Sequence, residues 1–146
     1  MSGSAKACHL CEQPGGELVW QGERLRVVRA VDTPAHPAFY RVIWNAHAAE
    51  FSDLSDAERL ECMAAVVAVE RVLRERLQPA KINLASLGNV VPHLHWHVIA
   101  RFEDDAHFPA PVWAAASRPG AALELQRLRE VLPELDRCVA RALSPL

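Results

Sequence analysis

The stretch His93-Leu94-His95-Trp96-His97-Val98-Ile99 places a histidine at every second position, with apolar residues between and after them. Successive side chains of a β-strand point to opposite faces of a sheet, so the three histidines share one face. Leu94, Trp96 and Val98 share the other face, which we expect to be the core face. The rise of a strand sets neighbouring imidazoles on one face about 6–7 Å apart.

The imidazole face has three interpretations. A solvated or hydrogen-bonded face without chemistry is the least favoured, because Ser, Thr or Lys would serve a wet face as well. Neutral imidazole can act as a nucleophile, an acid or base, or a metal ligand near neutral pH. A metal centre of strand histidines and a nucleophile that attacks phosphorus therefore both remain open.

The histidine segment matches the signature His-φ-His-φ-His-φ-φ, where φ is apolar, and in this it resembles the histidine-triad (HIT) family. Two flanking stretches extend the likeness. KINLASLGNVVP (residues 81–92) is similar to the strand and phosphate-binding turn before the triad in family members. RVIWNAH (residues 41–47) is similar to the segment that leads from the second sheet strand to the long helix. The likeness covers most of the chain and is greatest to a bacterial branch of the family.

The resemblance implies that the middle histidine, His95, is the nucleophile. It would attack the α-phosphorus of a nucleotide and form a covalent nucleotidyl-histidine, from which water releases the nucleoside monophosphate. This splits one difficult displacement into two easier ones. His95 would have to be neutral, with the proton of its second nitrogen donated to a backbone carbonyl. His97 would lie beside the phosphate oxygens and the leaving group, for positioning and proton donation.

The resemblance also implies four substrate-binding residues: Asp32, Asn83, Gly88 and Asn89. Asp32 follows a strand where relatives place an acid against the ribose hydroxyls, although it is equally interpreted as a turn former before Thr33-Pro34. Asn83 and Asn89 fall near positions that contact phosphate or support the turn. Gly88 would let backbone N–H groups approach the phosphate, and Gly88-Asn89 is also consistent with an ordinary hairpin turn.

The chain departs from its relatives at three places. Ala100 stands where relatives commonly have proline, which is a structural change. Trp96 and Trp44 are bulkier than the residues usual at their positions. We expect Trp96 on the core face and Trp44 to narrow or line the site.

The N-terminal pair Cys8 and Cys11 has C-x-x-C spacing, which in a cytosolic chain suggests metal or redox chemistry rather than a disulfide. Some family members bind a structural zinc with such a pair, a histidine leading into the long helix and the first triad histidine. Here these residues are Cys8, Cys11, His47 and His93, a standard closed tetrahedral set. His9 is an alternative ligand. We expect a structural Zn²⁺ and no cofactor required for the chemistry.

The remaining cysteines and histidines are given structural interpretations. Cys62 and Cys138 fall on expected helices and are interpreted as small apolar fillers of the core. His36 and His107 fall in loops, where we expect them to be solvated.

Composition narrows the classes of protein. The chain has 146 residues, which fits one domain, and a formal net charge of -2, which argues against a general nucleic-acid binder. No apolar run approaches membrane-spanning length, and residues 1–7 lack the apolar core of a signal peptide. We therefore expect a cytoplasmic protein with neither nucleic acid nor membrane as a partner.

Apolar patterning predicts strands at residues 18–20, 24–30 and 39–44, and a strand pair at 81–87 and 94–102 around Gly88-Asn89. A helix should begin at Ser55, which forms a capping-box pattern with Glu58, and should end at Gln78-Pro79. Its residues at helical spacing are Leu60, Met63, Val67, Glu70 and Leu73. A last helix should cover residues 121–143, with an interruption near Pro133.

This order of elements predicts an α+β domain. By resemblance it is one HIT domain over residues 1–146: an antiparallel sheet with one long helix packed on it and a C-terminal helical extension. Residues 1–16 would form a zinc-binding segment, and residues 103–146 the C-terminal loop and helix. The resemblance further implies a homodimer whose sheets continue across the interface.

The function that the resemblance implies is hydrolysis or transfer at the α-phosphate of a nucleoside phosphoramidate or a dinucleoside polyphosphate, with a purine nucleotide or dinucleotide as substrate. Two alternatives stay open. One is a non-catalytic nucleotide-binding or adaptor protein of the same fold. The other is a metalloenzyme that uses the triad as metal ligands.

Overall fold

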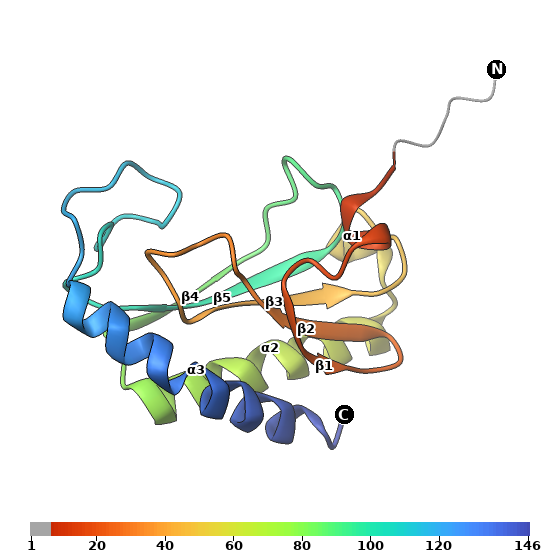
Figure 1. Cartoon of the computed structure of the whole chain (residues 1–146). Coiled ribbons are helices and arrows are strands. Elements are labelled where there is room, and N and C mark those ends of the chain that lie inside the picture. Colours follow the sequence, from red (N-terminus) through yellow and green to blue (C-terminus); the bar gives the residue numbers. More distant parts are fainter. Residues whose placement is uncertain (1–6) are drawn as a thin grey trace.

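The computed structural model describes residues 7–146, which form one five-stranded sheet with the two long helices on one face (Figure 1). The strand order is β1-β2-β3-β5-β4, and every neighbouring pair is antiparallel. The strands are β1 (Glu17–Gln21), β2 (Leu25–Arg29), β3 (Phe39–Trp44), β4 (Lys81–Ala85) and β5 (His95–Arg101). The helices are α1 (His9–Glu12), the 3-10 helix η1 (Phe51–Asp53), α2 (Asp56–Leu77) and α3 (Ala122–Leu143). The expected α+β architecture is confirmed.

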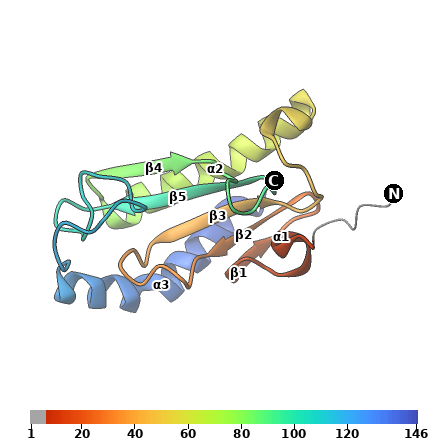
Figure 2. The same ribbon diagram turned by 90° about the horizontal axis from the view of Figure 1, so that it is seen from above.

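The two long helices divide the molecule into layers. Both α2 and α3 lie under one face of the sheet, whereas α1 and the long loops lie on the other side (Figures 1 and 2). The core fills the space between sheet and helices, with Val42 and Val98 from the sheet, Val69 and Leu73 from α2, and Val139 from α3, all fully buried. The C-terminal extension is therefore a second core helix beside α2.

Trp44 and Trp96 both belong to this helix side. Trp96 is partly buried and its ring lies edge-on to Phe51, with centroids 5.5 Å apart, as expected for the core face. The expectation that Trp44 narrows or lines the site was wrong. Trp44 is paired with Leu25 in the sheet register, and both side chains are buried in the helix-side core.

Helix α2 begins and ends as expected. The Ser55 hydroxyl accepts the N–H of Glu58, while the Glu58 carboxylate accepts the N–H of Ser55. Gln78 ends the helix in the left-handed conformation, with φ of 48°. Of the apolar residues at helical spacing, Leu73 is fully buried, whereas Leu60 and Val67 are 73% and 39% exposed. The buried residues are Cys62, Ala65, Val66, Val69, Val72 and Leu73, whose mostly small side chains let the helix approach the sheet.

Helix α3 runs unbroken through Pro133, so the expected interruption was wrong. Proline removes the N–H that would bond the carbonyl of Arg129. Pro133 lies on the exposed side of the helix, where water can hydrate that carbonyl. Cys138 on this helix is buried, as is Cys62 on α2, which agrees with their interpretation as core fillers.

Among residues 7–146, no helix combines the length and the apolar character needed to cross a bilayer. The expectation about the N-terminal stretch falls almost entirely on residues 1–6, which lie outside the described residues.

Candidate active site

His95 and His97 lie on β5 and face away from the two long helices. In the register between β3 and β5, His97 is paired with Arg41 and His95 with Ile43. On the other side of β5, Ala85 of β4 is paired with His97. The predicted alternation is realised for His95 and His97, whereas His93 precedes the strand. Strand β5 has β3 on one side and β4 on the other (Figure 2).

His95 has a defined tautomer. Its Nδ1 lies 2.5 Å from the carbonyl oxygen of His93, and because a carbonyl only accepts, Nδ1 must carry the proton. Burial lowers the pKa of His95; the hydrogen bond to His93 opposes this shift, and the charge of Arg41 adds to it. The ring is therefore neutral near pH 7, with the lone pair on Nε2.

His97 is packed among aromatic rings. Its ring centroid lies 4.9 Å from that of His95, 5.3 Å from that of Phe39 and 5.1 Å from that of Trp113. Burial, and then the nearby His95 and Arg41, lower the pKa of His97 to about 4. Its buried Nδ1 has no hydrogen-bond partner among the described residues. His97 is therefore a neutral imidazole with an unused ring nitrogen beside His95.

Arg41 and Asp32 form an ion pair next to these histidines. One guanidinium nitrogen of Arg41 donates to the carbonyl of Gly15 at 2.9 Å, and another lies 3.1 and 3.3 Å from the Asp32 carboxylate oxygens. Both residues, with Gly15 and Gly16, line a cavity of about 360 Å³ between the N-terminal segment and the loop after β2. The structure thus brings Asp32 to the triad side of the sheet. Sequence reasoning missed Arg41, although a lone charge in the apolar strand Phe39–Trp44 was the available signal.

The other three expected substrate-binding residues lie around β4 and the loop that follows it. Asn83 is on the triad face, and its side-chain oxygen accepts a hydrogen bond from Arg101 at 2.8 Å. Gly88 has φ of 75°, a left-handed conformation that favours glycine. Asn89 is exposed in the same loop. Because β4 ends at Ala85 and β5 begins at His95, Gly88-Asn89 is part of a longer loop and not a tight hairpin turn.

His93 faces away from the other two triad histidines and toward the N-terminal segment. Its Nδ1 lies 3.3 Å from the Cys8 sulfur and 3.4 Å from the Cys11 sulfur. The Nδ1 of His47 lies 3.5 Å from the Cys11 sulfur. The ligand atoms of these four residues all lie within 4.8 Å of one another. His9, the alternative ligand, is not part of this group.

The donor set of this cluster fits zinc. Two thiols and two imidazoles from separate parts of the fold converge, as in closed tetrahedral zinc sites. The Nε2 of His93 lies 2.5 Å from the carbonyl of Trp44, which leaves Nδ1 facing the thiols. Burial lowers the pKa of His93, and burial together with Cys8 raises the pKa of the Cys11 thiol. Both shifts favour the neutral forms of the His93 imidazole and the Cys11 thiol.

Arg26 holds the segment that carries the two cysteines against the sheet. Its guanidinium donates to the backbone carbonyls of Leu10, Pro14 and Gln13, at 2.7, 3.0 and 3.2 Å, and to the side chain of Asn45. The cysteine segment is thus positioned by contacts that need no metal.

His36 is not solvated, contrary to expectation, whereas His107 is partly exposed. His36 is 6% exposed, and its Nε2 lies 2.8 Å from Nδ1 of His107. Nearby, Asp105 accepts hydrogen bonds from Arg101 and from the backbone N–H groups of Phe102, His107 and Phe108. Burial raises the pKa of Asp105, but these hydrogen bonds outweigh it and hold the pKa well below its usual range. This network fixes the loop of residues 102–121, which places Trp113 against His97.

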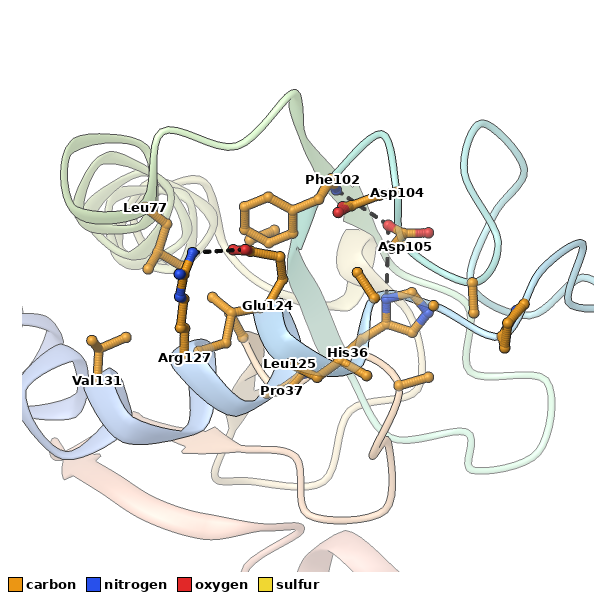
Figure 3. A pocket seen from close by; sticks show the side chains of 18 of the residues that line it. His36, Pro37, Leu77, Phe102, Asp104, Asp105, Glu124, Leu125, Arg127 and Val131 are labelled. Carbon is orange, nitrogen blue, oxygen red and sulfur yellow. Dashed lines mark hydrogen bonds and ion pairs between the residues drawn. The ribbon is translucent and has the colours of Figure 1, made fainter.

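A second cavity, of about 380 Å³, lies on the helix side of the sheet (Figure 3). Leu77, Phe102, Leu125 and Val131 line it, with Arg127 and Glu124 paired at its edge. None of the triad histidines lines this cavity, so it is separate from the chemistry described above.

Comparison with known proteins agrees with the geometry. The family model of the HIT domain matches residues 16–104. An AP-4-A phosphorylase of Mycobacterium tuberculosis is 28% identical over 101 residues, which are 65% of this chain and 52% of the relative. The chain thus spans about half the length of the curated relatives it matches.

Solved structures show the same fold. A histidine triad protein from Bradyrhizobium japonicum has a TM-score of 0.68 and 27% identity, covering 84% of this chain and 91% of its own. A zinc-bound histidine triad family protein from Mycobacterium smegmatis has a TM-score of 0.58 and 22% identity, covering 90% of this chain and 96% of its own. At that identity the second likeness shows the fold alone.

Proposed function

The chain belongs to the histidine triad family, and we propose that it is a nucleotide hydrolase or transferase that acts at an α-phosphate through His95. The substrate would be a nucleoside phosphoramidate or a dinucleoside polyphosphate with a purine base. The relative named AP-4-A phosphorylase supports the general class, and its matched region includes about half of that protein.

The observation that carries this proposal is the tautomer of His95. Its Nδ1 proton is donated to the His93 carbonyl, so the Nε2 lone pair is available and the ring needs no prior loss of a proton. Burial keeps the ring neutral by lowering its pKa. A neutral imidazole held in one orientation is what nucleophilic attack on phosphorus requires.

The reaction would proceed in two displacements. First, Nε2 of His95 forms a bond to the α-phosphorus, while the bond to the bridging oxygen or nitrogen breaks and the leaving group takes the electron pair and a proton supplied by solvent. Second, the oxygen of water or another acceptor attacks the same phosphorus and releases its proton to solvent, while the phosphorus–nitrogen bond breaks and its electron pair returns to Nε2. Nucleoside monophosphate, or its ester, is released and His95 is regenerated.

Other residues would position the substrate. The imidazole of His97, whose ring lies beside that of His95, would form a hydrogen bond to a phosphate oxygen or to the leaving group. Asp32 would accept the ribose hydroxyls from the edge of the neighbouring cavity. Asn83, Gly88 and Asn89 would contact phosphate or support the loop before the triad.

The position of His93 argues against the triad as a metal centre. Its Nδ1 faces the two thiols and its Nε2 the Trp44 carbonyl, so it offers no nitrogen toward His95 and His97. The other alternative, a non-catalytic nucleotide-binding protein, would bind nucleotide in the cavity without converting it to product.

The deciding experiment compares wild type with His95→Ala on an adenosine phosphoramidate and on diadenosine tetraphosphate. We expect adenosine monophosphate from wild type alone, and a nucleotidyl adduct on His95 trapped by rapid acid quench and detected by mass spectrometry. Product formation by His95→Ala at the wild-type rate would refute the assignment. Nucleotide binding without turnover in wild type would instead support the non-catalytic alternative.

We further propose that Cys8, Cys11, His47 and His93 bind one structural Zn²⁺. The ion would link the N-terminal segment to the sheet and would take no part in the reaction. Elemental analysis of protein purified without added metal should give about one zinc per chain, and the paired variant Cys8→Ser/Cys11→Ser should give none. Zinc retained by that variant would refute the ligand set.

We also propose a cytoplasmic homodimer in which an edge strand of the sheet pairs with its copy. Strands β1 and β4 are the two edges of the sheet. Light scattering after gel filtration should give twice the chain mass, and a monomer would refute the assembly.

A further inference from the structure

We propose that Arg41 is a substrate-binding residue, whose guanidinium exchanges Asp32 for an oxygen of the α-phosphate when nucleotide binds. The inference rests on the proposed function and adds to it a charged contact to phosphate that the triad pattern does not contain. Three structural features carry it: the position of Arg41, the nature of its partners, and the different use of the other arginines on this face.

The position of Arg41 is set by strand pairing. Arg41 and His97 are directly paired between β3 and β5, so their side chains leave the same face of the sheet as neighbours. The Arg41 guanidinium lies over the Phe39 ring, 5.4 Å from its centroid, and that ring in turn contacts His97. Arg41 also lines the cavity of about 360 Å³. It therefore stands between the catalytic strand and the space available for a nucleoside.

The partners of Arg41 hold it on one side only. The Gly15 carbonyl fixes one end of the guanidinium at 2.9 Å. The other end contacts Asp32, whose side chain is 66% exposed, whereas that of Arg41 is 18% exposed. An ion pair to so exposed a carboxylate contributes little and is readily exchanged for a phosphate oxygen. The exchange would also free Asp32 to accept ribose hydroxyls.

The other strand arginines of this face have no such exchangeable partner. Arg26 is engaged by three backbone carbonyls and Asn45. Arg101 is 1% exposed and is engaged by Asp105, Asn83 and the Ala110 carbonyl. The hydrogen bonds of Arg26 hold the cysteine segment, and those of Arg101 hold the loop after β5. An exchange of these partners for a ligand would release those segments. Of these three arginines, Arg41 alone has a charge that can be offered to a ligand.

A cation at this place suits the proposed chemistry. Negative charge accumulates on the phosphoryl oxygens during transfer, and a preorganised guanidinium stabilises it. Because Arg41 approaches from β3 and the loop after β4 approaches from the opposite side of β5, the phosphate would be held from both sides of His95.

The test measures affinity for adenosine monophosphate and for adenosine by calorimetry, in wild type, Arg41→Met and Arg41→Lys. We expect Arg41→Met to weaken monophosphate binding by about 10- to 100-fold and to leave adenosine binding within about threefold, since a hydrogen bond to a charged group is lost. Arg41→Lys should retain part of the difference, because it keeps the charge without the planar fork. If Arg41→Met does not fold, the comparison of wild type with Arg41→Lys still tests the inference.

The matched control is Arg24→Met, which breaks another arginine–carboxylate pair, to Glu61 at 3.2 Å, away from the triad. Its monophosphate affinity should equal that of wild type. Equal loss of monophosphate and adenosine binding in Arg41→Met, or no loss of either, would overturn the inference about Arg41 while leaving the proposed function in place. Failure of wild type itself to bind adenosine monophosphate would overturn both.

Discussion

Replacing His97 by glutamine should flatten the dependence of stability on pH. The folded protein holds the pKa of His97 at about 4, mainly by burial, against an ordinary value of 6.5. Between these two pH values His97 is mostly protonated in the unfolded chain and mostly neutral in the folded protein. The free energy of unfolding therefore falls as the pH is lowered from about 6.5 to about 4, and is lowest below the folded pKa.

The size of the effect follows from the same two values. At pH 4.5 the unfolded histidine is almost fully protonated and the folded one mostly neutral, which costs the wild type about 2.5 kcal/mol relative to pH 7.5. Glutamine does not titrate, so His97→Gln should lose about 2.5 kcal/mol less than wild type over this range. The carboxylates that also titrate are common to both proteins and cancel in the comparison.

The assay is urea unfolding followed by tryptophan fluorescence at pH 7.5 and 4.5, with a chelator present throughout so that metal makes no contribution. His9→Gln, at an exposed histidine of α1, is the control and should behave as wild type. If wild type and His97→Gln lose the same stability to within about 0.5 kcal/mol, His97 is not held neutral by the fold and the reasoning is refuted.

Three further predictions concern the fold and are measured by urea or thermal unfolding. Leu73→Ala should lower the free energy of unfolding by about 2–5 kcal/mol, because Leu73 is fully buried. Leu60→Ala should change it by less than about 0.5 kcal/mol, because Leu60 is 73% exposed. Equal effects of the two substitutions would contradict the observed buried face of α2. Asp105→Asn should cost about 3–5 kcal/mol, since it leaves the buried Arg101 without its charged partner, and a neutral result would show that the network does not stabilise the loop. Ser55→Ala should cost about 1 kcal/mol through loss of the helix cap, and an unchanged midpoint would contradict a role for that cap.

Local patterns predicted the parts of the structure that depend on local geometry. The alternation in residues 93–99 predicts a strand and its two faces because the period of a strand is independent of the rest of the fold, and the strand is present from His95 onward. The capping box of Ser55 and Glu58 likewise needs only one turn of helix. The spacing of Cys8 and Cys11 marked a candidate metal site, although only the resemblance connected it with His47 and His93.

Features that depend on distant packing could not be read in this way. The buried face of α2 is decided by the sheet and by α3, so Leu60 and Val67 have helical spacing but no partner. Trp44 is paired with Leu25 and points to the helices. The observation that relatives carry smaller residues at this position does not reveal that direction. The burial of His36 depends on His107, which is 71 residues later in the chain.

His93 shows why the three histidines of the pattern are not three equivalent groups. Its Nδ1 faces the thiols, its Nε2 faces the Trp44 carbonyl, and its own carbonyl accepts the Nδ1 proton of His95 at 2.5 Å. The side chain therefore belongs to the candidate metal cluster, whereas the backbone carbonyl belongs to the candidate active site. Any contact that fixes the position of His93 also fixes the carbonyl that sets the tautomer of His95. In the proposed reaction the first histidine of the triad would thus act through its main chain, and the spacing of two residues connects the two candidate sites.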